Sequence, residues 1–251
     1  MKKIAVLNFK GGTGKTSTVV NLGPGLAMRG KKVLVVDTDP QGSASYNLGN
    51  QSANTLYEVI VKNLPLTKAI TTVRKNLDLI PGSDHLYPLE LKMAILPEKE
   101  QIFSRVLSQI KNYDYVIVDC GPGINLINQN VLLYADEIII PVSMEYLSLV
   151  GVKQLLKNIK IINKIFGKEI RICKVVPTFV DHRNKKTQNV LESLQKVFPS
   201  KISNEIRTCV SLSEAPGYKI SIFEYDKNSR GAEDYSKLVD GVLKDGKEKT
   251  R

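Results

Sequence analysis

Residues 9–18 read FKGGTGKTST and have the types and spacing that bind the phosphates of a nucleotide. They meet the phosphate-loop pattern G-x-x-x-x-G-K-[ST] except at its first glycine, where Phe9 stands. Glycines open backbone angles that let successive N–H groups turn toward phosphate oxygens. Lys15 would meet the β and γ phosphates as a point charge, and the Thr16 hydroxyl would bind Mg²⁺. The nucleotide-binding residues predicted by this pattern are Gly11, Gly12, Thr13, Gly14, Lys15, Thr16 and Ser17.

Two aspartates end other apolar runs of the chain. Asp39 closes the segment VLVVDTD, and Asp119 closes YVIVD, with one cysteine between it and Gly-Pro-Gly. Taken alone, each reads as a carboxylate that caps a turn. Beside a phosphate loop, a carboxylate at the end of a buried strand can instead hold Mg²⁺ through water or orient the attacking water. We therefore predict Thr16, Asp39 and Asp119 as the residues around the metal.

Short apolar runs alternate with amphipathic segments, which predicts an α/β fold built from right-handed βαβ units. Its sheet should be mainly parallel and twisted, with helices covering both faces. The phosphate loop would join a strand to a helix whose N-terminal dipole favours an anion, at the carboxyl edge where such sheets bind ligands. The expected strands are residues 3–9, 33–37, 76–80, 114–119, 137–142, 170–176 and 220–224, with a weaker indication near 202–206.

Composition indicates one globular domain. The 251 residues are 42% hydrophobic and 24% charged, so the chain can bury one substantial core, and we expect a single domain over 1–251. No apolar run reaches the roughly 18 residues of a membrane span. The expected strand at the N-terminus predicts a cytoplasmic protein with neither a signal peptide nor an N-terminal helix-turn-helix domain. The remaining candidate metal ligands are scattered and read as packing or loop residues: Cys120, Cys173, Cys209, His85 and His182.

Several motifs together carry a family resemblance. They are KGGTGKTST, DTDPQG, VDCGPG, LSEAPG and SRGAEDY. On these motifs the chain resembles, over essentially its whole length, the ParA/Soj family of DNA-segregation ATPases, relatives of MinD. The resemblance implies slow hydrolysis of ATP with Mg²⁺ and a homodimer that sandwiches two ATP molecules. It also implies nonspecific binding to double-stranded DNA, localisation to the nucleoid, and stimulation by the basic N-terminal segment of a ParB-type centromere-binding protein.

The same resemblance assigns roles to the catalytic residues Lys10, Lys15 and Asp39. Lys10 would be the signature lysine that reaches the phosphates bound by the partner subunit, and Asp39 would position the attacking water. Asp119 would be the acidic group near Mg²⁺. Electrostatics supports the first assignment, because two ammonium groups from one loop would repel each other at a single triphosphate. An extended Lys10 facing a second active site would instead neutralise charge there.

Positive charge gathers in the second half of the chain. Residues from 150 onward hold 21 of the 36 Lys and Arg and 12 of the 25 Asp and Glu, which is +9 of the total +11. The expected helix 151–166 has a lysine row that either binds phosphates or forms a solvated face. Its apolar stripe would be Val152, Leu155, Leu156, Ile159, Ile162 and Ile165, and its lysines are Lys153, Lys157, Lys160 and Lys164. The other DNA-binding candidates are Arg183, Lys185, Lys186 and Arg207, together with the basic tail 244–251.

Three positions depart from what is usual in the family. Ser211 stands where relatives commonly have an arginine before LSEAP, which puts one DNA contact in doubt. Gly121 replaces a common proline after Asp119. Pro24 should kink or shorten the helix that follows the phosphate loop, since proline removes a backbone donor. By resemblance, the adenine contacts would come from 178–181 and 207–214.

Three other functions are less consistent with the sequence. A MinD-like membrane ATPase would need bulky apolar residues near its C-terminus, but KDGKEKTR at 244–251 is polar. An electron-transfer ATPase would need cysteines placed to hold a cluster. An ATP-dependent dimerising scaffold of low turnover, used for polar or cargo positioning, remains the main alternative, and Asp39 argues for turnover against it.

Overall fold

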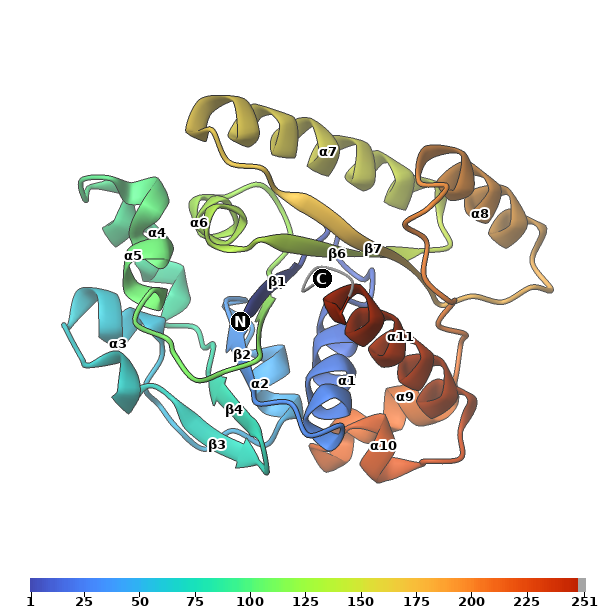
Figure 1. Cartoon of the computed structure of the whole chain (residues 1–251), viewed down its shortest axis with the longest axis horizontal. Helices are drawn as coiled ribbons and strands as arrows, with labels where there is room; N and C mark the ends of the chain where they lie inside the picture. Colours follow the sequence, from blue (N-terminus) through green and yellow to red (C-terminus); the bar gives the residue numbers. More distant parts are fainter. Residues whose placement is uncertain (248–251) are drawn as a thin grey trace.

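The centre of the molecule is a seven-stranded sheet with the strand order β3-β4-β2-β5-β1-β6-β7. The computed structural model describes residues 1–247 (Figure 1). All neighbouring strands run parallel except β3 and β4, so the predicted fold class is confirmed. The strands are β1 (Lys2–Val6), β2 (Val33–Asp37), β3 (Thr71–Arg74), β4 (Leu77–Ile80), β5 (Tyr115–Asp119), β6 (Glu137–Ser143) and β7 (Arg171–Thr178).

Helices cover both faces of the sheet (Figure 1). One face is packed against α1 (Lys15–Met28), α2 (Ser43–Asn47), α10 (Ile222–Tyr225) and α11 (Arg230–Lys247), with α9 (Val210–Glu214) beside α10. The other face is packed against α3 (Leu56–Val61), α4 (Leu86–Ala94), α5 (Ile102–Leu107), α6 (Leu126–Tyr134), α7 (Tyr146–Phe166) and α8 (Lys185–Val197).

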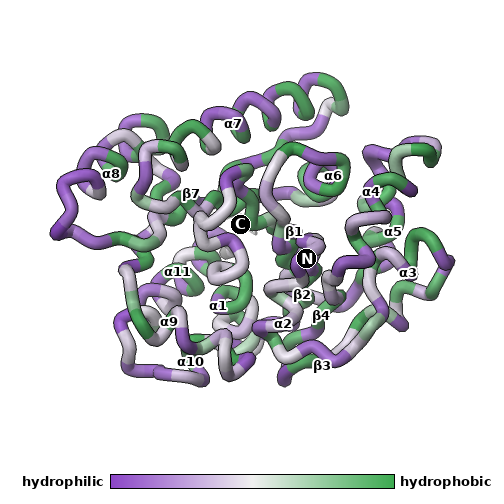
Figure 2. Tube along the Cα trace, turned by 180° about the vertical axis from the view of Figure 1, so that it is seen from behind, coloured by the Kyte–Doolittle hydropathy of each residue, from purple (hydrophilic) through white to green (hydrophobic). Residues whose placement is uncertain are grey.

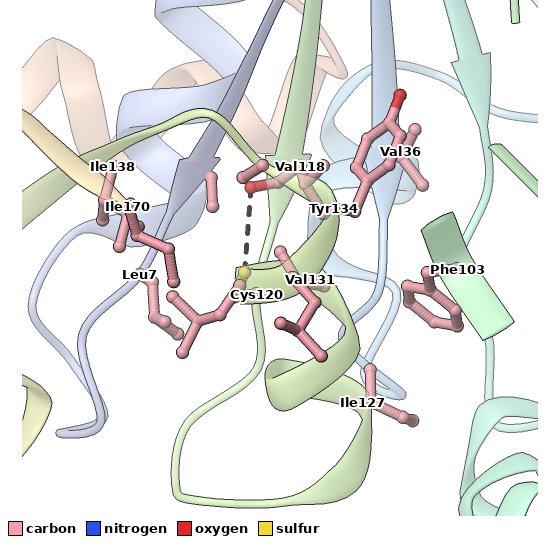
Figure 3. Packing of buried hydrophobic residues seen from close by; sticks show 14 of the residues in the cluster. Leu7, Val36, Phe103, Val118, Cys120, Ile127, Val131, Tyr134, Ile138 and Ile170 are labelled. Atoms are coloured by element: carbon pink, nitrogen blue, oxygen red, sulfur yellow. Dashed lines mark hydrogen bonds between the residues drawn. The ribbon is translucent and has the colours of Figure 1, made fainter. Parts of the chain in front are cut away.

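Alternate residues of each central strand enter the two cores. In β1, Ile4 and Val6 face α1 and α11, whereas Ala5 faces the opposite layer. This period of two is what a strand buried on both sides requires. Cys120 belongs to the second layer, packed among Leu7, Val118 and Val131, and its thiol lies 3.9 Å from the carbonyl oxygen of Val118 (Figure 3). Cys120 is therefore a core residue, as expected.

Two strand predictions are wrong in position or type. Residues 220–224 contain no strand, because Ser221 and Glu224 form a capping box that starts α10. Near 202–206 the chain makes only isolated bridges, Ile202 to Val175 and Arg207 to Val180. The antiparallel edge strand β3 was not predicted. Its residues 71–74 (TTVR) are short and half exposed, so they lack an apolar run.

Of the two expected effects of Pro24, a kink or a shortening of α1, the shortening does not occur. The helix runs from Lys15 to Met28 with Pro24 inside it, and residues 23–25 are all buried. A Cβ atom on Gly25 would lie 2.6 Å from Val239 Cγ2 and 2.9 Å from Phe223 Cε2. The Gly-Pro-Gly segment therefore lets α1 approach α10 and α11 closely, which the sequence pattern alone did not reveal.

Helix α7 is longer than predicted and its apolar stripe is narrower. It begins at Tyr146, five residues before the predicted start, and Ile165 is 67% exposed rather than buried. The four lysines of the row are exposed, and apolar and polar residues alternate along the helix (Figure 2). Of the predicted basic tail, 244–247 belong to α11, and the remainder lies outside the described residues.

Candidate functional site

The phosphate loop joins β1 to α1 at the carboxyl edge of the sheet. Gly12 and Gly14 have φ angles of 70° and 83°, which glycine adopts at no steric cost. Gly14 caps α1, so the first amides of the helix have no intrahelical acceptor and face the loop. On the far side, the Thr178 hydroxyl at the end of β7 donates to the Thr13 carbonyl at 2.9 Å. This arrangement suits an anion bound inside the loop.

The two lysines of the loop lie in different places. Lys15 is 7% exposed, and its Nζ donates to the Lys10 carbonyl oxygen at 3.1 Å, inside the loop. Burial lowers the pKa of Lys15 although nearby carboxylates, first Asp119, oppose that shift. The Lys10 side chain extends away from the loop to the start of α7, where its Nζ lies 2.5 Å from Glu145 Oε2. Lys10 is thus held outside the phosphate cradle of its own chain.

The predicted metal residues lie together beside this loop. Thr16 Oγ1 donates to Asp119 Oδ2 at 2.8 Å. Asp39 follows β2, the neighbour of β5, and its Oδ1 accepts from the Gln41 amide at 2.9 Å. A Cβ atom on Gly121 would lie 3.5 Å from the Asp39 carboxyl carbon. Gly121 therefore lies next to the Asp39 carboxylate, which places Asp39 beside the loop that follows Asp119.

Asp119 has a buried carboxylate oxygen that would suit a cation. Its Oδ1 is buried and has no hydrogen-bond partner among the described residues. Burial, and then the charge of neighbouring Asp37, raise the pKa of Asp119 well above its ordinary value. A hard divalent cation prefers carboxylate and hydroxyl oxygens and would stabilise the ionised form of this group. The donor set of Thr16, Asp39 and Asp119 therefore fits Mg²⁺.

Asp37 is a buried carboxylate that the sequence reasoning passed over in favour of Asp39. Its Oδ2 accepts from both the amide and the hydroxyl of Ser45, and its Oδ1 accepts from the Asp39 amide at 3.1 Å. Burial raises the pKa of Asp37 to about 6 against these hydrogen bonds. Asp37 thereby fixes the turn that carries Asp39. The only sign of this in the sequence is an aspartate at the end of an apolar run.

The surroundings of Lys10 were also not predicted. Asn8 is fully buried and connects the loop to β6, donating to the Pro141 carbonyl and accepting from the Lys10 amide. Gly151 on α7 approaches the loop so closely that a Cβ atom there would lie 2.8 Å from Asn8 Oδ1. Ser148 Oγ is 3.4 Å from Lys10 Nζ. The contacts to β6 and α7 join residues more than 130 positions apart, so no local motif could reveal them.

The segments suggested for adenine lie on one groove of about 790 Å³. Val180 and Asp181 come from one segment, and residues 207–211 come from the other. Ser211, which replaces the usual arginine, donates to Asp226 at 3.1 Å. Arg230, at the start of α11 and within the motif SRGAEDY, lines the same groove.

The DNA-binding candidates occupy different environments. Arg183 is 89% exposed and pairs with Asp181, whose pKa it lowers to about 2 through hydrogen bonds. Arg207 donates to both oxygens of the buried Asp234 and to Glu233, so its guanidinium is already engaged. The pair Lys185 and Lys186 is exposed at the start of α8. Within residues 1–247 neither lysine forms an ion pair.

No helix within residues 1–247 is long and apolar enough to cross a membrane. In the same part of the chain no three residues among His, Cys, Asp and Glu gather as a metal cluster. His85 and His182 instead contact the carboxylates of Glu58 and Glu205.

Comparisons with known proteins identify similar sequences and folds. A sequence model for a family described as an AAA domain matches residues 1–172. The chain is 39% identical to the sporulation initiation inhibitor protein Soj of Bacillus subtilis over 98% of this chain and 99% of that protein. It is 34% identical to the chromosome-partitioning ATPase Soj of Treponema pallidum over 98% of each chain.

Two solved structures share the fold. An ATP complex of Cyanothece McdA superposes with a TM-score of 0.86 at 24% identity, covering 97% of this chain and 95% of that one. Cobyrinic acid a,c-diamide synthase from Mycobacterium smegmatis, with a bound ATP analogue and magnesium, superposes with a TM-score of 0.83 at 26% identity. The match covers 98% of this chain and 96% of that one.

The parallel sheet and the phosphate loop at its carboxyl edge define a P-loop NTPase of the α/β class. Within that class, the relatives that match nearly the whole chain include the chromosome-partitioning ATPase Soj of Treponema pallidum and the chromosome partitioning protein ParA of Caulobacter vibrioides. The chain belongs to the ParA/Soj family of chromosome-partitioning ATPases.

Proposed function

We propose that this chain is an ATPase that partitions chromosomal or plasmid DNA. It binds ATP with Mg²⁺, dimerises on ATP, and holds double-stranded DNA nonspecifically on the nucleoid. Slow hydrolysis of ATP, accelerated by a ParB-type centromere-binding protein, releases the chain from the DNA. The observation that carries this proposal is that the two lysine side chains point to different places. Lys15 faces the phosphate cradle of its own chain, whereas Lys10 lies outside it.

A second copy of the chain would supply the ammonium group that completes each site. Lys10 has a 25% exposed side chain, and the neighbouring loops and the start of α7 expose apolar side chains that would be covered in a dimer. These apolar residues, each about half exposed or more, are Ile124, Tyr146, Leu147, Val150 and Phe179. Loss of the γ phosphate would remove the anion that both subunits share, so hydrolysis would weaken the dimer.

The chemistry within one chain is divided among three groups. Lys15 binds the phosphates, Asp39 orients water, and Thr16 with Asp119 holds Mg²⁺. Bound Mg²⁺ would neutralise charge that develops on the β and γ phosphates. Slow intrinsic turnover is favoured because Arg207 is held by the buried carboxylate of Asp234 and is not free to stabilise the transition state.

Nonspecific DNA binding would come from the basic half of the chain. Lys185 and Lys186 are exposed and unpaired in the described structure, whereas Arg207 would need to leave Asp234. Arg183 would exchange Asp181 for a phosphate, at little cost because the pair is exposed. Contacts of this kind read phosphates rather than bases, so they suit binding that is independent of sequence.

The test compares the wild type with Lys10→Ala and Asp39→Ala in three assays: ATP hydrolysis, ATP-dependent dimerisation by sedimentation, and binding to a duplex of random sequence. Lys10→Ala should lose all three activities. Asp39→Ala should lose hydrolysis by about 100-fold or more and remain a DNA-bound dimer. If Lys10→Ala dimerises on ATP as the wild type does, the proposal is wrong.

A further inference from the structure

The turn that carries Asp39 is packed against a second loop of the chain. This turn, residues 38–42, joins β2 to α2, and the second loop, residues 81–83 (Pro-Gly-Ser), follows β4. A Cβ atom on Gly82 would lie 2.8 Å from the Asp39 carbonyl oxygen, and one on Gly42 would lie 2.8 Å from the Gly82 carbonyl oxygen. Gly42 also has a φ angle of 60°, which disfavours a side chain there. The backbones of the turn and of the second loop are therefore in direct contact.

The Ser45 side chain of α2 joins the turn to this second loop. Its hydroxyl donates to Asp37 Oδ2 at 2.7 Å and accepts from the Gly82 amide at 2.8 Å. The Ser45 amide donates to the same Asp37 oxygen at 2.8 Å. The other carboxylate oxygen of Asp37 accepts from the Asp39 amide at 3.1 Å. Hydrogen bonds therefore connect the second loop to the backbone of Asp39 through two side chains.

Both of these side chains are enclosed in protein. Asp37 is fully buried, and Ser45 is 3% exposed. The one hydrogen of the Ser45 hydroxyl is donated to Asp37, so this hydroxyl is not a donor for a phosphate. A buried polar network whose members are all satisfied fixes one arrangement of its groups. Ser45 and the second loop can therefore influence hydrolysis only through the turn.

The direction of the Asp39 carboxylate depends on the backbone of the turn. Its Oδ1 accepts from the Gln41 amide at 2.9 Å, and within residues 1–247 no other group donates a hydrogen bond to this carboxylate. The Asp39 carbonyl oxygen accepts from the Gly42 amide at 2.9 Å, so this bond also lies within the turn. A shift of the turn would therefore move the carboxylate that is proposed to orient water.

We propose that Ser45 and Gly82 are positioning residues for hydrolysis, which hold the turn so that the Asp39 carboxylate faces the attacking water. This inference rests on the proposed ATPase function and adds to it two residues outside the nucleotide site. A misplacement of about 1 Å can cost about 100-fold in rate. The phosphate loop lies between β1 and α1, so loss of this support should slow hydrolysis and leave ATP binding intact.

The experiment measures kcat and KM for ATP hydrolysis by the full chain with Mg²⁺, and ATP-dependent dimerisation by sedimentation. Ser45→Ala should lower kcat by about tenfold or more, keep KM within about twofold and retain the dimer, because only hydrolysis needs the turn in place. Ser45→Thr keeps the hydroxyl and should restore kcat to within about threefold of the wild type. Urea unfolding shows whether each variant is folded.

The matched control is Ser221→Ala at the N-terminus of α10. Ser221 makes the same kind of contact as Ser45, because its amide and hydroxyl both donate to one carboxylate oxygen, Glu224 Oε2, at 2.9 and 2.7 Å. It is also buried, at 1% exposed. Ser221→Ala should therefore lose a similar contact and still keep kcat within about twofold of the wild type.

Gly82→Ala tests the second loop without changing any hydrogen-bonding group. Its added methyl group would lie 2.8 Å from Asp37 Cγ and from the Asp39 carbonyl oxygen, so the turn must shift. This variant should lower kcat by about tenfold or more with little change in KM, as Ser45→Ala does.

Three results would overturn the inference. They are a wild-type kcat in Ser45→Ala, an equal loss of kcat in Ser221→Ala, and a loss of ATP-dependent dimerisation in Ser45→Ala as large as its loss of hydrolysis. The last two would indicate a general effect on folding instead of a specific effect on Asp39. Failure of the proposed function would be seen separately, as a wild type that neither hydrolyses ATP nor dimerises on it.

Discussion

Lys10 is the residue on which the proposed mechanism most depends. In the single chain it is paired with Glu145 and lies near Ser148, at the N-terminal end of α7. To reach a partner's phosphates it must leave Glu145, whose pKa it lowers by hydrogen bonding. An exposed ion pair of this kind is weak, so it can hold Lys10 extended without preventing the exchange.

Substitution of Glu145 tests that exchange. Glu145→Gln removes the charge that retains Lys10. The dissociation constant of the ATP-dependent dimer should therefore fall by about two- to fivefold. The dimer dissociation constant would be measured by sedimentation at saturating ATP in an Asp39→Ala background, which prevents hydrolysis from confusing the result. A dimer weakened by Glu145→Gln would mean that Glu145 serves the assembled state instead.

At the residue scale the sequence predicted the local chemistry and missed the residues that hold it. Lys15, Thr16 and Asp119 were predicted from spacing and strand ends, and the structure brings Thr16 and Asp119 to 2.8 Å. Asn8 and Glu145 could not be predicted, because their partners lie more than 130 positions away in the chain. Such contacts depend on which strands become neighbours.

Among the elements, α1 shows how a helix can require glycine in its interior. Gly25→Ala should destabilise the protein by about 1–3 kcal/mol, because the added methyl group would overlap Val239 and Phe223 and outweigh the gain in helix propensity. Gly241→Ala on α11 should instead stabilise it by about 0.5–1 kcal/mol, since only the flexible Lys174 side chain lies near, at 3.8 Å. Urea unfolding of both variants measures the contrast. Equal effects would show that α1 and α11 can separate to accept the methyl group.

The N-terminus of α3 predicts a dependence of stability on pH. Burial raises the pKa of Glu58, but hydrogen bonds from the amide and hydroxyl of Thr55 and from His85 outweigh it and lower the pKa to about 2. Since the folded-state pKa lies below the ordinary value of 4.5, the stabilisation is present above about pH 4.5 and is lost as the pH falls toward 2.

Glu58→Gln should therefore cost about 2 kcal/mol at pH 7 and clearly less at pH 3.5. Chemical unfolding at the two pH values gives the difference. The exposed Glu192→Gln on α8 serves as the control and should change stability little at either pH. A cost for Glu58→Gln that does not shrink at low pH would contradict the assignment.

At the element scale, the pattern of apolar residues predicts strands correctly where the strands are buried on both faces. The central strands β1, β2, β5 and β6 have continuous apolar runs and were predicted in place. Strand β3 was missed because it lies at the sheet edge and is only half buried. Residues 220–224 were assigned to a strand because their apolar content outweighed the capping box of Ser221 and Glu224, a helix signal that the prediction overlooked.

Over the whole molecule, positive charge is concentrated in the second half of the chain, and this predicts how the affinity for DNA should depend on salt. Lys185→Ala/Lys186→Ala should weaken binding to a random duplex and reduce the slope of log K against log salt by up to about 2. The measurement is fluorescence anisotropy of the duplex from low to physiological salt, with ATP present.

A matched pair controls for the loss of net charge. Lys68→Ala/Lys75→Ala also removes two exposed lysines, but from the region around β3. It should change neither affinity nor slope appreciably. If the two double variants behave alike, DNA senses only the total charge, and Lys185 and Lys186 are not specific contacts.

The central claim is that Lys10 acts across the subunit boundary, and mixing two inactive chains tests it most directly. Lys10→Ala and Asp39→Ala are combined in equal amounts before ATP is added, and the hydrolysis rate is compared with the sum of the separate rates. In a mixed dimer, the Lys10→Ala chain keeps its own Asp39 and receives Lys10 from the partner, so one site of two is complete. We predict recovery of up to about a quarter of the wild-type rate. A mixture no faster than the sum of its parts would show that Lys10 acts within its own chain and would contradict the account.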